Sequence, residues 1–245
     1  MKNYKLHIQY DGTRYNGWQK QTNTDNTITT KLESILSDIL HQSISLHGSG
    51  RTDAGVHANG QIANFHFHKN INYIDLQNQL NCLLPEDIVV NAITEVPLSF
   101  HSRLSALSKT YIYKIDTQSP PSVFQRKYSY SLEKPLRIDL MKTAAILCCG
   151  EHDFISFSSL KPSSKSTIRT IYSIDIYDND SIIEIHYTGD GFLYNMVRIL
   201  TGTLIEVGLE HISPNTIPDI IKARNRQLAG PTAPPQGLFL DSVIY

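Results

Sequence analysis

The segment Tyr4-Lys5-Leu6-His7-Ile8-Gln9-Tyr10 alternates apolar and polar side chains along its whole length. A period of two residues is typical of a half-buried β-strand. The next patterned stretch has a period near 3.6, which predicts an amphipathic helix capped by Asn26. Its apolar stripe consists of Ile28, Leu32, Ile35, Leu36, Ile39 and Leu40. The chain therefore begins as a strand followed by a helix.

Strand and helix patterns continue to alternate irregularly along the 245 residues. The spacing predicts strands at 43–47, 61–67, 88–96, 109–117, 169–178, 181–188 and 238–245, and helices at 75–83, 138–149, 194–207 and 217–223. Because no regular βαβ order emerges, we expect an α+β fold with largely antiparallel mixed sheets flanked by helices. We expect two halves of similar make-up, residues 1–105 with an aspartate loop and residues 106–245 with tyrosine and arginine partners.

Composition excludes several classes of protein. The chain carries 22 Lys plus Arg against 23 Asp plus Glu, and only 18% of its residues are charged, which is not the composition of a disordered chain. No apolar run approaches the ~18 residues of a membrane helix, and no targeting segment precedes the first strand pattern. Three cysteines without paired spacing favour a reducing cytoplasm.

One loop has the composition of a catalytic site. Residues 48–58, Gly-Ser-Gly-Arg-Thr-Asp-Ala-Gly-Val-His-Ala, place three glycines around Arg51 and Asp53. A phosphate cradle is one interpretation, but the Gly-Lys-Ser/Thr of a P-loop is missing. An exposed ion pair is another. The pattern favours a third, a carboxylate held on a sharp turn and kept ionised by a cation, which suits a nucleophile or general base.

A second segment supplies a cation from a distant part of the chain. In Gly191-Phe192-Leu193-Tyr194-Asn195-Met196-Val197-Arg198, an aromatic stretch leads into a predicted helix. Arg198 would share a helix face with Tyr194, next to apolar Val197. A largely buried arginine requires an anion. The alternative is that Arg198 extends along its own stem into solvent.

A basic strip lies between residues 101 and 127. Its five cations accompany a single acid, Asp116, and the tyrosines Tyr111 and Tyr113 lie among them. Cations that meet phosphates and rings that stack on bases characterise a nucleic-acid surface, although tyrosines in a strand also serve as core. The cations are Arg103, Lys109, Lys114, Arg126 and Lys127. His66 and His68 share a strand face but have no third ligand, so we expect no metal site.

Taken in order, these motifs resemble the tRNA pseudouridine synthase A family. The resemblance runs nearly end to end, and its most specific string is Gly50-Arg51-Thr52-Asp53-Ala54-Gly55-Val56-His57-Ala58. It also includes residues 10–19, 100–103, 111–113, 152–154, 191–198 and 237–240. It implies a pseudouridine synthase fold with an active-site cleft between the halves, a homodimer, and isomerisation of uridine to pseudouridine at positions 38 to 40 of the tRNA anticodon arm.

The resemblance also implies roles for individual residues. Asp53 is similar to the catalytic aspartate, Arg198 to its ion-pair partner, and Tyr111 to the ring that packs on the target uracil. Substrate contacts are expected from Arg51, which would fill the space of the flipped base, and from Arg103, Lys109 and Leu240. The chain departs from the family at Leu104-Ser105-Ala106 and at Ser158, where an arginine is common. Lys161 or Lys165 could replace that contact.

The chemistry needs no cofactor, metal or energy donor, because the reaction only moves the glycosidic bond from N1 to C5. Asp53 could attack C1′, add to C6 or remove a proton at C2′, and the sequence does not choose among these routes. Two other classes remain as alternatives. An RNA-binding module would use the basic strip but leave Asp53 and Arg198 without a role, and a nucleoside hydrolase would normally need a second carboxylate or bound calcium.

Overall fold

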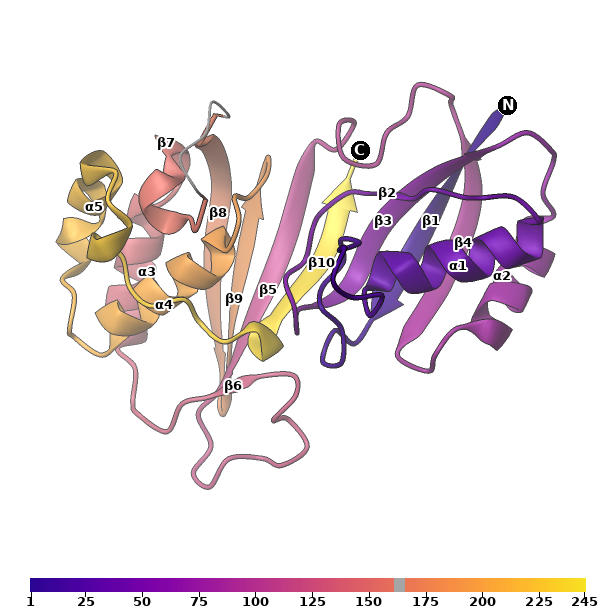
Figure 1. Ribbon diagram of the computed structural model, residues 1–245. Helices are drawn as coiled ribbons and strands as arrows, with labels where there is room; N and C mark the ends of the chain where they lie inside the picture. The colour runs from indigo at the N-terminus through magenta and orange to yellow at the C-terminus, as the bar shows by residue number, and fades with distance from the viewer. Residues whose placement is uncertain (161–165) are drawn as a thin grey trace. The chain divides into compact units, whose positions relative to one another are not determined.

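A computed structural model describes residues 1–160 and 166–245, and these residues form two compact units (Figure 1). The first unit comprises Met1–Leu107 with Phe239–Tyr245, and the second comprises Ser108–Leu238. Among the described residues, no helix is both long enough and apolar enough to cross a bilayer. The fold is α+β, with mixed sheets and helices.

The first unit is a mostly antiparallel sheet with two helices. Its strands run in the order β4-β1-β3-β10, and the short β2 pairs with β3. All the pairings are antiparallel except the parallel contact of β10 with β3. The elements are β1 (Lys2–Tyr10), α1 (Ile28–Leu40), β2 (His47–Gly48), β3 (His57–Phe67), α2 (Tyr73–Leu83), β4 (Ile88–Val96) and β10 (Leu238–Ile244).

Side-chain pattern explains these elements. Tyr4, Leu6 and Ile8 of β1 have no exposed surface, as the alternation predicts. Helix α1 buries Leu32 and Leu36 from the predicted stripe. Its N-cap is Thr27, whose side chain accepts from the backbone N–H of Thr30 at 3.2 Å, so the prediction of Asn26 as the cap was wrong by one residue.

The predicted strand at 43–47 is wrong apart from its last residue. The N–H of Ile44 donates to the hydroxyl of Ser37, and the N–H of Leu46 donates to the carboxylate of Glu33 at 2.8 Å. These two backbone N–H groups are bonded to side chains of α1, so they cannot pair with a neighbouring strand. The alternation of Ile44 and Leu46, both buried, reflects packing of an irregular segment.

The second unit is an antiparallel sheet in the order β5-β9-β8-β7, and β6 adds a short parallel pair to β5. Helices α3, α4 and α5 lie together on one side of it (Figure 1). The elements are β5 (Ser108–Asp116), β6 (Tyr130–Ser131), α3 (Ile138–Leu147), β7 (Gly150–Asp153), β8 (Ile168–Asn179), β9 (Ile182–Gly189), α4 (Met196–Gly208) and α5 (Ile217–Ala223).

The final strand belongs to the first unit and not to the second half, where the sequence had placed it. Phe239 and Leu240 of β10 pair with His57 and Ala58 of β3. Periodicity identifies a strand but carries no information about which distant strand accepts its hydrogen bonds. The boundary between the units falls at Leu107, two residues after the predicted limit.

Candidate active site

Asp53 lies on a tight turn in the first unit. The N–H of Val56 donates to the Asp53 carbonyl at 3.1 Å, and Gly55 between them has a φ of +78°. A turn with positive φ at its third position requires glycine, because a side chain there would be strained. The Asp53 side chain is half-buried. The Ala-Gly that follows the aspartate therefore fixes the backbone from which its carboxylate extends.

The segment that follows β1 supports this turn. The backbone N–H of Trp18 donates to the carbonyl of Thr52 at 3.0 Å, and the hydroxyls of Thr52 and buried Tyr10 lie 2.8 Å apart. The N–H of Gly55 donates to the carbonyl of Tyr15 at 3.3 Å. The Tyr10-to-Gln19 motif, to which the sequence assigned no role, thus holds the aspartate loop on one side.

Two glycines allow this approach. A Cβ on Gly12 would lie 2.0 Å from the Val56 carbonyl oxygen, and one on Gly17 would lie 2.6 Å from that of Thr52. Gly17 also has a φ of +87°. Both distances are shorter than any side chain tolerates, so the two backbones touch only because these residues are glycine.

A buried amide holds the other side of the loop. Gln61 accepts from the Ser49 hydroxyl at 2.7 Å and from the Gly50 N–H at 3.3 Å, and its own NH₂ donates to the Gly50 carbonyl at 2.9 Å. Gln61 has no exposed surface. The strand predicted at 61–67 begins at this residue, and no role was assigned to its side chain. A polar residue in a buried strand pattern requires partners, which is the signal that could have identified it.

Arg103 lies on a loop tied to the start of the same segment. The rings of His47 and His101 are 5.0 Å apart, and the Ser102 hydroxyl donates to the His47 carbonyl. The Tyr245 hydroxyl donates to the Ser102 carbonyl at 2.6 Å. Burial and the neighbouring His47 lower the pKa of His101, whose Nδ1 accepts from the Arg103 N–H. The Arg103 side chain is exposed on this anchored loop.

In the second unit, Arg198 occupies the first turn of α4. Its Nε donates to the Ala233 carbonyl at 2.7 Å and its Nη1 to the Asn195 side-chain oxygen at 3.1 Å. The guanidinium is thus fixed by protein acceptors and does not simply extend into solvent. Helix α4 begins at Met196, so the predicted sharing of a helix face with Tyr194 was wrong; Asn195, with a φ of +61°, ends the preceding turn.

The two strand tyrosines have different surroundings. Tyr113 is fully buried and donates to the Pro234 carbonyl at 2.8 Å, and burial raises the pKa of its hydroxyl. This tyrosine is core. Tyr111 is 8% exposed and meets the ring of Phe192 edge-on at 5.3 Å. Phe192 comes from the aromatic segment before α4, so the structure brings Tyr111 beside the segment that carries Arg198.

The remaining predicted contacts divide between the units. Arg51 is exposed in the first unit, and Leu240 there is fully buried, so a substrate contact at Leu240 requires its neighbours to move. Lys109 is half-buried in the second unit. Lys114 forms an ion pair with Glu184 at 2.8 Å, which compensates one charge of the predicted basic strip.

Ser158, the departure from the family pattern, is a structural residue in this chain. It is 3% exposed; its hydroxyl donates to the Tyr194 carbonyl at 3.3 Å and accepts from the Leu160 N–H at 3.1 Å. Lys161 and Lys165, suggested as replacements, lie outside the described residues. Within residues 1–160 and 166–245, no three His, Cys, Asp or Glu side chains are grouped so that they could hold a metal ion.

The Arg-Thr-Asp-Ala-Gly turn on an α+β scaffold occurs in a chain whose relatives are pseudouridine synthases. A family model described as tRNA pseudouridine synthase matches residues 6–104 and 144–245. The chain is 49% identical, over all 245 residues and the whole relative, to a "tRNA pseudouridine synthase A" of Bacillus sp. (strain KSM-64). It is 45% identical over the same extent to a "tRNA pseudouridine synthase A 1" of Clostridium tetani and 42% identical to a "tRNA pseudouridine synthase A 2" of Bacillus anthracis. The chain belongs to the tRNA pseudouridine synthase A family.

A solved structure of a Cbf5-Nop10-Gar1 complex is a far more distant match. It aligns with 82% of this chain at 12% identity and a TM-score of 0.37. This chain spans 45% of that one, so the family assignment rests on the sequence relatives.

Removing the buried amide should loosen the aspartate loop. Gln61→Leu leaves the Ser49 hydroxyl and the Gly50 N–H without their acceptor, so we expect a loss of about 1–3 kcal/mol in unfolding free energy and a lower kcat. Urea unfolding and isomerisation assays measure both. Gln77→Leu is the control, because the Gln77 amide likewise bonds to the backbone, donating to two carbonyls, but lies on α2. Equal loss of kcat in both variants would mean that Gln61 has no special role.

Proposed function

We propose that this chain isomerises uridine to pseudouridine in the anticodon arm of tRNA, at positions 38 to 40. Two findings support the proposal: membership of the tRNA pseudouridine synthase A family, and the half-buried Asp53 on its glycine-dependent turn. The turn is the observation that carries it. A nucleophile or base acts only if its backbone holds it at a reacting distance from the substrate.

We further propose that Asp53 acts in a cleft between the units, with Arg198 as its cation and Tyr111 packing on the uracil. The side chains of Arg198 and Tyr111 are each held in place by contacts within their own unit. Arg198 is held by Ala233 and Asn195, and Tyr111 is held against Phe192. A fixed guanidinium favours the ionised form of a nearby carboxylate and loses little rotamer freedom when it binds one.

The reaction breaks the N1–C1′ bond and forms a C5–C1′ bond, and the proton on C5 is replaced while N1 gains one. Asp53 would attack C1′, add to C6 or remove a C2′ proton. In each route one carboxylate serves both halves of the isomerisation, and the released uracil must stay bound while it turns. The ring of Tyr111 supplies an apolar surface on which the uracil can turn without leaving.

Mass analysis of treated tRNA tests the proposal against its rivals. Isomerisation leaves the tRNA mass unchanged and produces a carbodiimide adduct that marks pseudouridine at the modified position. Loss of uracil mass would identify a hydrolase. Unchanged mass without an adduct would leave only RNA binding. Adducts at positions 38 to 40 support the proposal, and adducts only elsewhere would contradict the assigned positions.

Arg51 is proposed to fill the space of the flipped base. Extruding a base from its stack costs a few kcal/mol, and an exposed arginine beside Asp53 can insert in its place. Arg51→Ala should therefore reduce turnover much more on folded tRNA than on a substrate whose target uridine is already unstacked. Turnover of both substrates, with the exposed Arg14→Ala as a control in the same unit, measures the difference. Equal losses on both substrates would assign Arg51 a direct chemical role instead.

The family resemblance also leads us to propose a homodimer in the cytoplasm, where tRNA is modified. Analytical ultracentrifugation tests the dimer directly, since the sedimentation coefficient of a monomer of 27.7 kDa is well separated from that of its dimer.

A further inference from the structure

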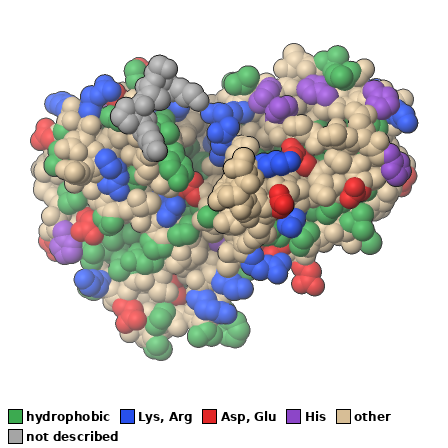
Figure 2. Space-filling model, in the orientation of Figure 1, with side chains coloured by type: hydrophobic (Ala, Val, Ile, Leu, Met, Phe, Trp, Pro, Cys, Tyr) green, Lys and Arg blue, Asp and Glu red, His purple; other side chains and the backbone are tan. Residues whose placement is uncertain are grey.

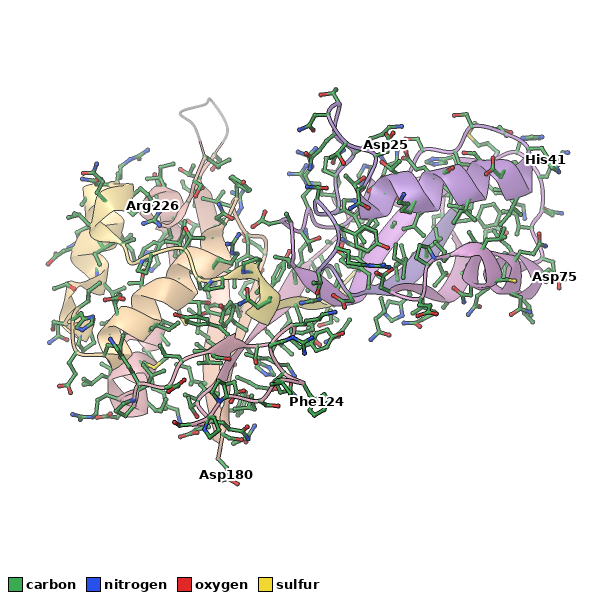
Figure 3. All side chains as sticks on the ribbon, turned by 60° about the horizontal axis from the view of Figure 1, so that its bottom comes forward. Asp25, His41, Asp75, Phe124, Asp180 and Arg226 are labelled. Atoms are coloured by element: carbon green, nitrogen blue, oxygen red, sulfur yellow. The ribbon has the colours of Figure 1, made fainter. Side chains whose placement is uncertain are left out.

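The loop between β5 and β6, residues 117–129, has no role in the site described above. It carries two of the most exposed apolar side chains of the second unit: Phe124 is 84% exposed and Val123 is 63% exposed. Figure 3 shows Phe124 on this loop, clear of the helices of its own unit. Val123 and Phe124 place two adjacent apolar side chains in water, and contiguous exposed apolar groups are typical of binding surfaces.

The loop is built to a definite shape. Asp116, fully buried at the end of β5, accepts from the N–H groups of Gln118 at 2.9 Å and Ser122 at 3.3 Å. On the other side, Ser129 donates to the Gln125 carbonyl through both its N–H and its hydroxyl, at 3.0 Å each. The single acid of the basic strip is therefore used to brace the loop from within.

Charge indicates the kind of partner. Residues 117–132 contain no Asp or Glu, while Arg126 and Lys127 follow the exposed apolar pair with only Gln125 between. The Arg126 guanidinium donates to the Val123 carbonyl, which holds it beside Phe124. At the foot of Figure 2, where Figure 1 places this loop, apolar and basic side chains lie together on the surface. A ring flanked by cations matches a polyanion with exposed bases, because every base offers a face for stacking.

Position separates this loop from the chemistry. Tyr111 and Asp116 lie five residues apart on β5, which corresponds to roughly 17 Å at the rise of an extended strand. The loop begins beyond Asp116, at the end of β5 away from Tyr111. It also lies outside the residues that the family model matches.

We propose that residues 122–127 form a second RNA-contacting site, in which Phe124 stacks on an unpaired base away from the target uridine and Arg126 binds the adjoining phosphate. This inference rests on the proposed function, since it takes the tRNA as the bound polyanion. The site adds affinity and positions the substrate without touching the reacting atoms.

The test is tRNA binding by Phe124→Ala and Arg126→Gln in the full-length protein. Stacking of one base on an aromatic ring is worth about 1–3 kcal/mol, so Phe124→Ala should raise Kd about fivefold to 150-fold. The slope of log K against log salt should stay unchanged in this variant and fall by about 0.7–0.9 in Arg126→Gln. Turnover at saturating tRNA should remain near wild type in both.

Two matched controls separate the loop from the general surface. Tyr172→Ala removes another aromatic ring, 55% exposed on β8, and Arg137→Gln removes a cation that is paired with Asp139. Both should leave Kd and the salt slope unchanged. If Phe124→Ala binds tRNA like wild type, or if it changes the oligomeric state and not Kd, the RNA site is wrong. If wild-type protein does not isomerise uridine, the proposed function fails instead.

Discussion

Asp53→Asn should abolish isomerisation while leaving tRNA affinity within roughly tenfold of wild type, a change of about 1.4 kcal/mol. Asparagine keeps the size and much of the hydrogen bonding of aspartate but is neither a nucleophile nor a base. The turn made by Gly55 and Val56 depends on backbone groups alone, so it should survive the change. Release of tritium from C5 of labelled uridine in tRNA reports the reaction, since C5 exchanges its hydrogen for the new glycosidic bond.

Asp25→Asn is the matched control, because Asp25 is an exposed carboxylate of the same unit. It should release tritium at the wild-type rate. Substantial release by well-folded Asp53→Asn protein would overturn the assignment of Asp53, and with it the proposed mechanism. Loss of tRNA binding far beyond tenfold would instead place Asp53 in substrate binding.

Arg198→Met should also be nearly inactive. In the proposed pairing of Asp53 with Arg198, methionine preserves the apolar stem but removes the cation, so the partly buried carboxylate takes up a proton more readily and loses its orientation. The acidic limb of the pH–rate profile should therefore move to higher pH, because less of the carboxylate is ionised at a given pH. Tritium release across a pH series measures both the loss of rate and the direction of this shift.

Arg198 also makes structural contacts, and a second variant separates these from the effect of its charge. Arg198 also holds the Ala233 carbonyl and Asn195, so Arg198→Met can act by loosening the start of α4. Arg198→Lys keeps the charge but cannot make both contacts, and it should retain the wild-type acidic limb with an intermediate rate. The double variant of Asp53→Asn with Arg198→Met should be no worse than Asp53→Asn alone, because residues that act as a unit are not additive. A further loss in the double variant would separate the two roles.

The predicted elements were most accurate where one face of a strand or helix is buried. The alternation of β1 and the stripe of α1 are repeated as burial in the structure, because side chains on one face share one environment. The predicted strand was wrong at Ser43–Leu46, where an alternating pattern packs without strand hydrogen bonds. Burial sets the alternation of side chains, but only a neighbouring backbone makes a strand.

For the site, local sequence was sufficient to predict the sharp bend that carries Asp53, whose catalytic role stays a prediction. Three glycines around an Arg-x-Asp string predict a sharp bend from neighbouring residues alone, and Gly55 adopts the positive φ of the turn. Sequence was insufficient for the support of that loop. The loop is held by contacts from Gln61 and Trp18. The neighbouring loop at Ser102 is held by Tyr245, which is 143 residues away in the chain. No local pattern encodes these contacts.

The sequence by itself therefore indicated the family, from motifs spread along the chain, and the class of fold, from the periods and order of its strands and helices. It also indicated the aspartate on which the proposed chemistry depends, from one glycine-rich loop. Tertiary structure alone decided that the last strand pairs with β3, that Arg198 is held by Ala233, and that the acid of the basic strip braces a loop. The first two of these contacts join residues distant in sequence, and the third depends on the burial of Asp116. Their energies depend on burial and on hydrogen-bond partners, which exist only once the chain has folded.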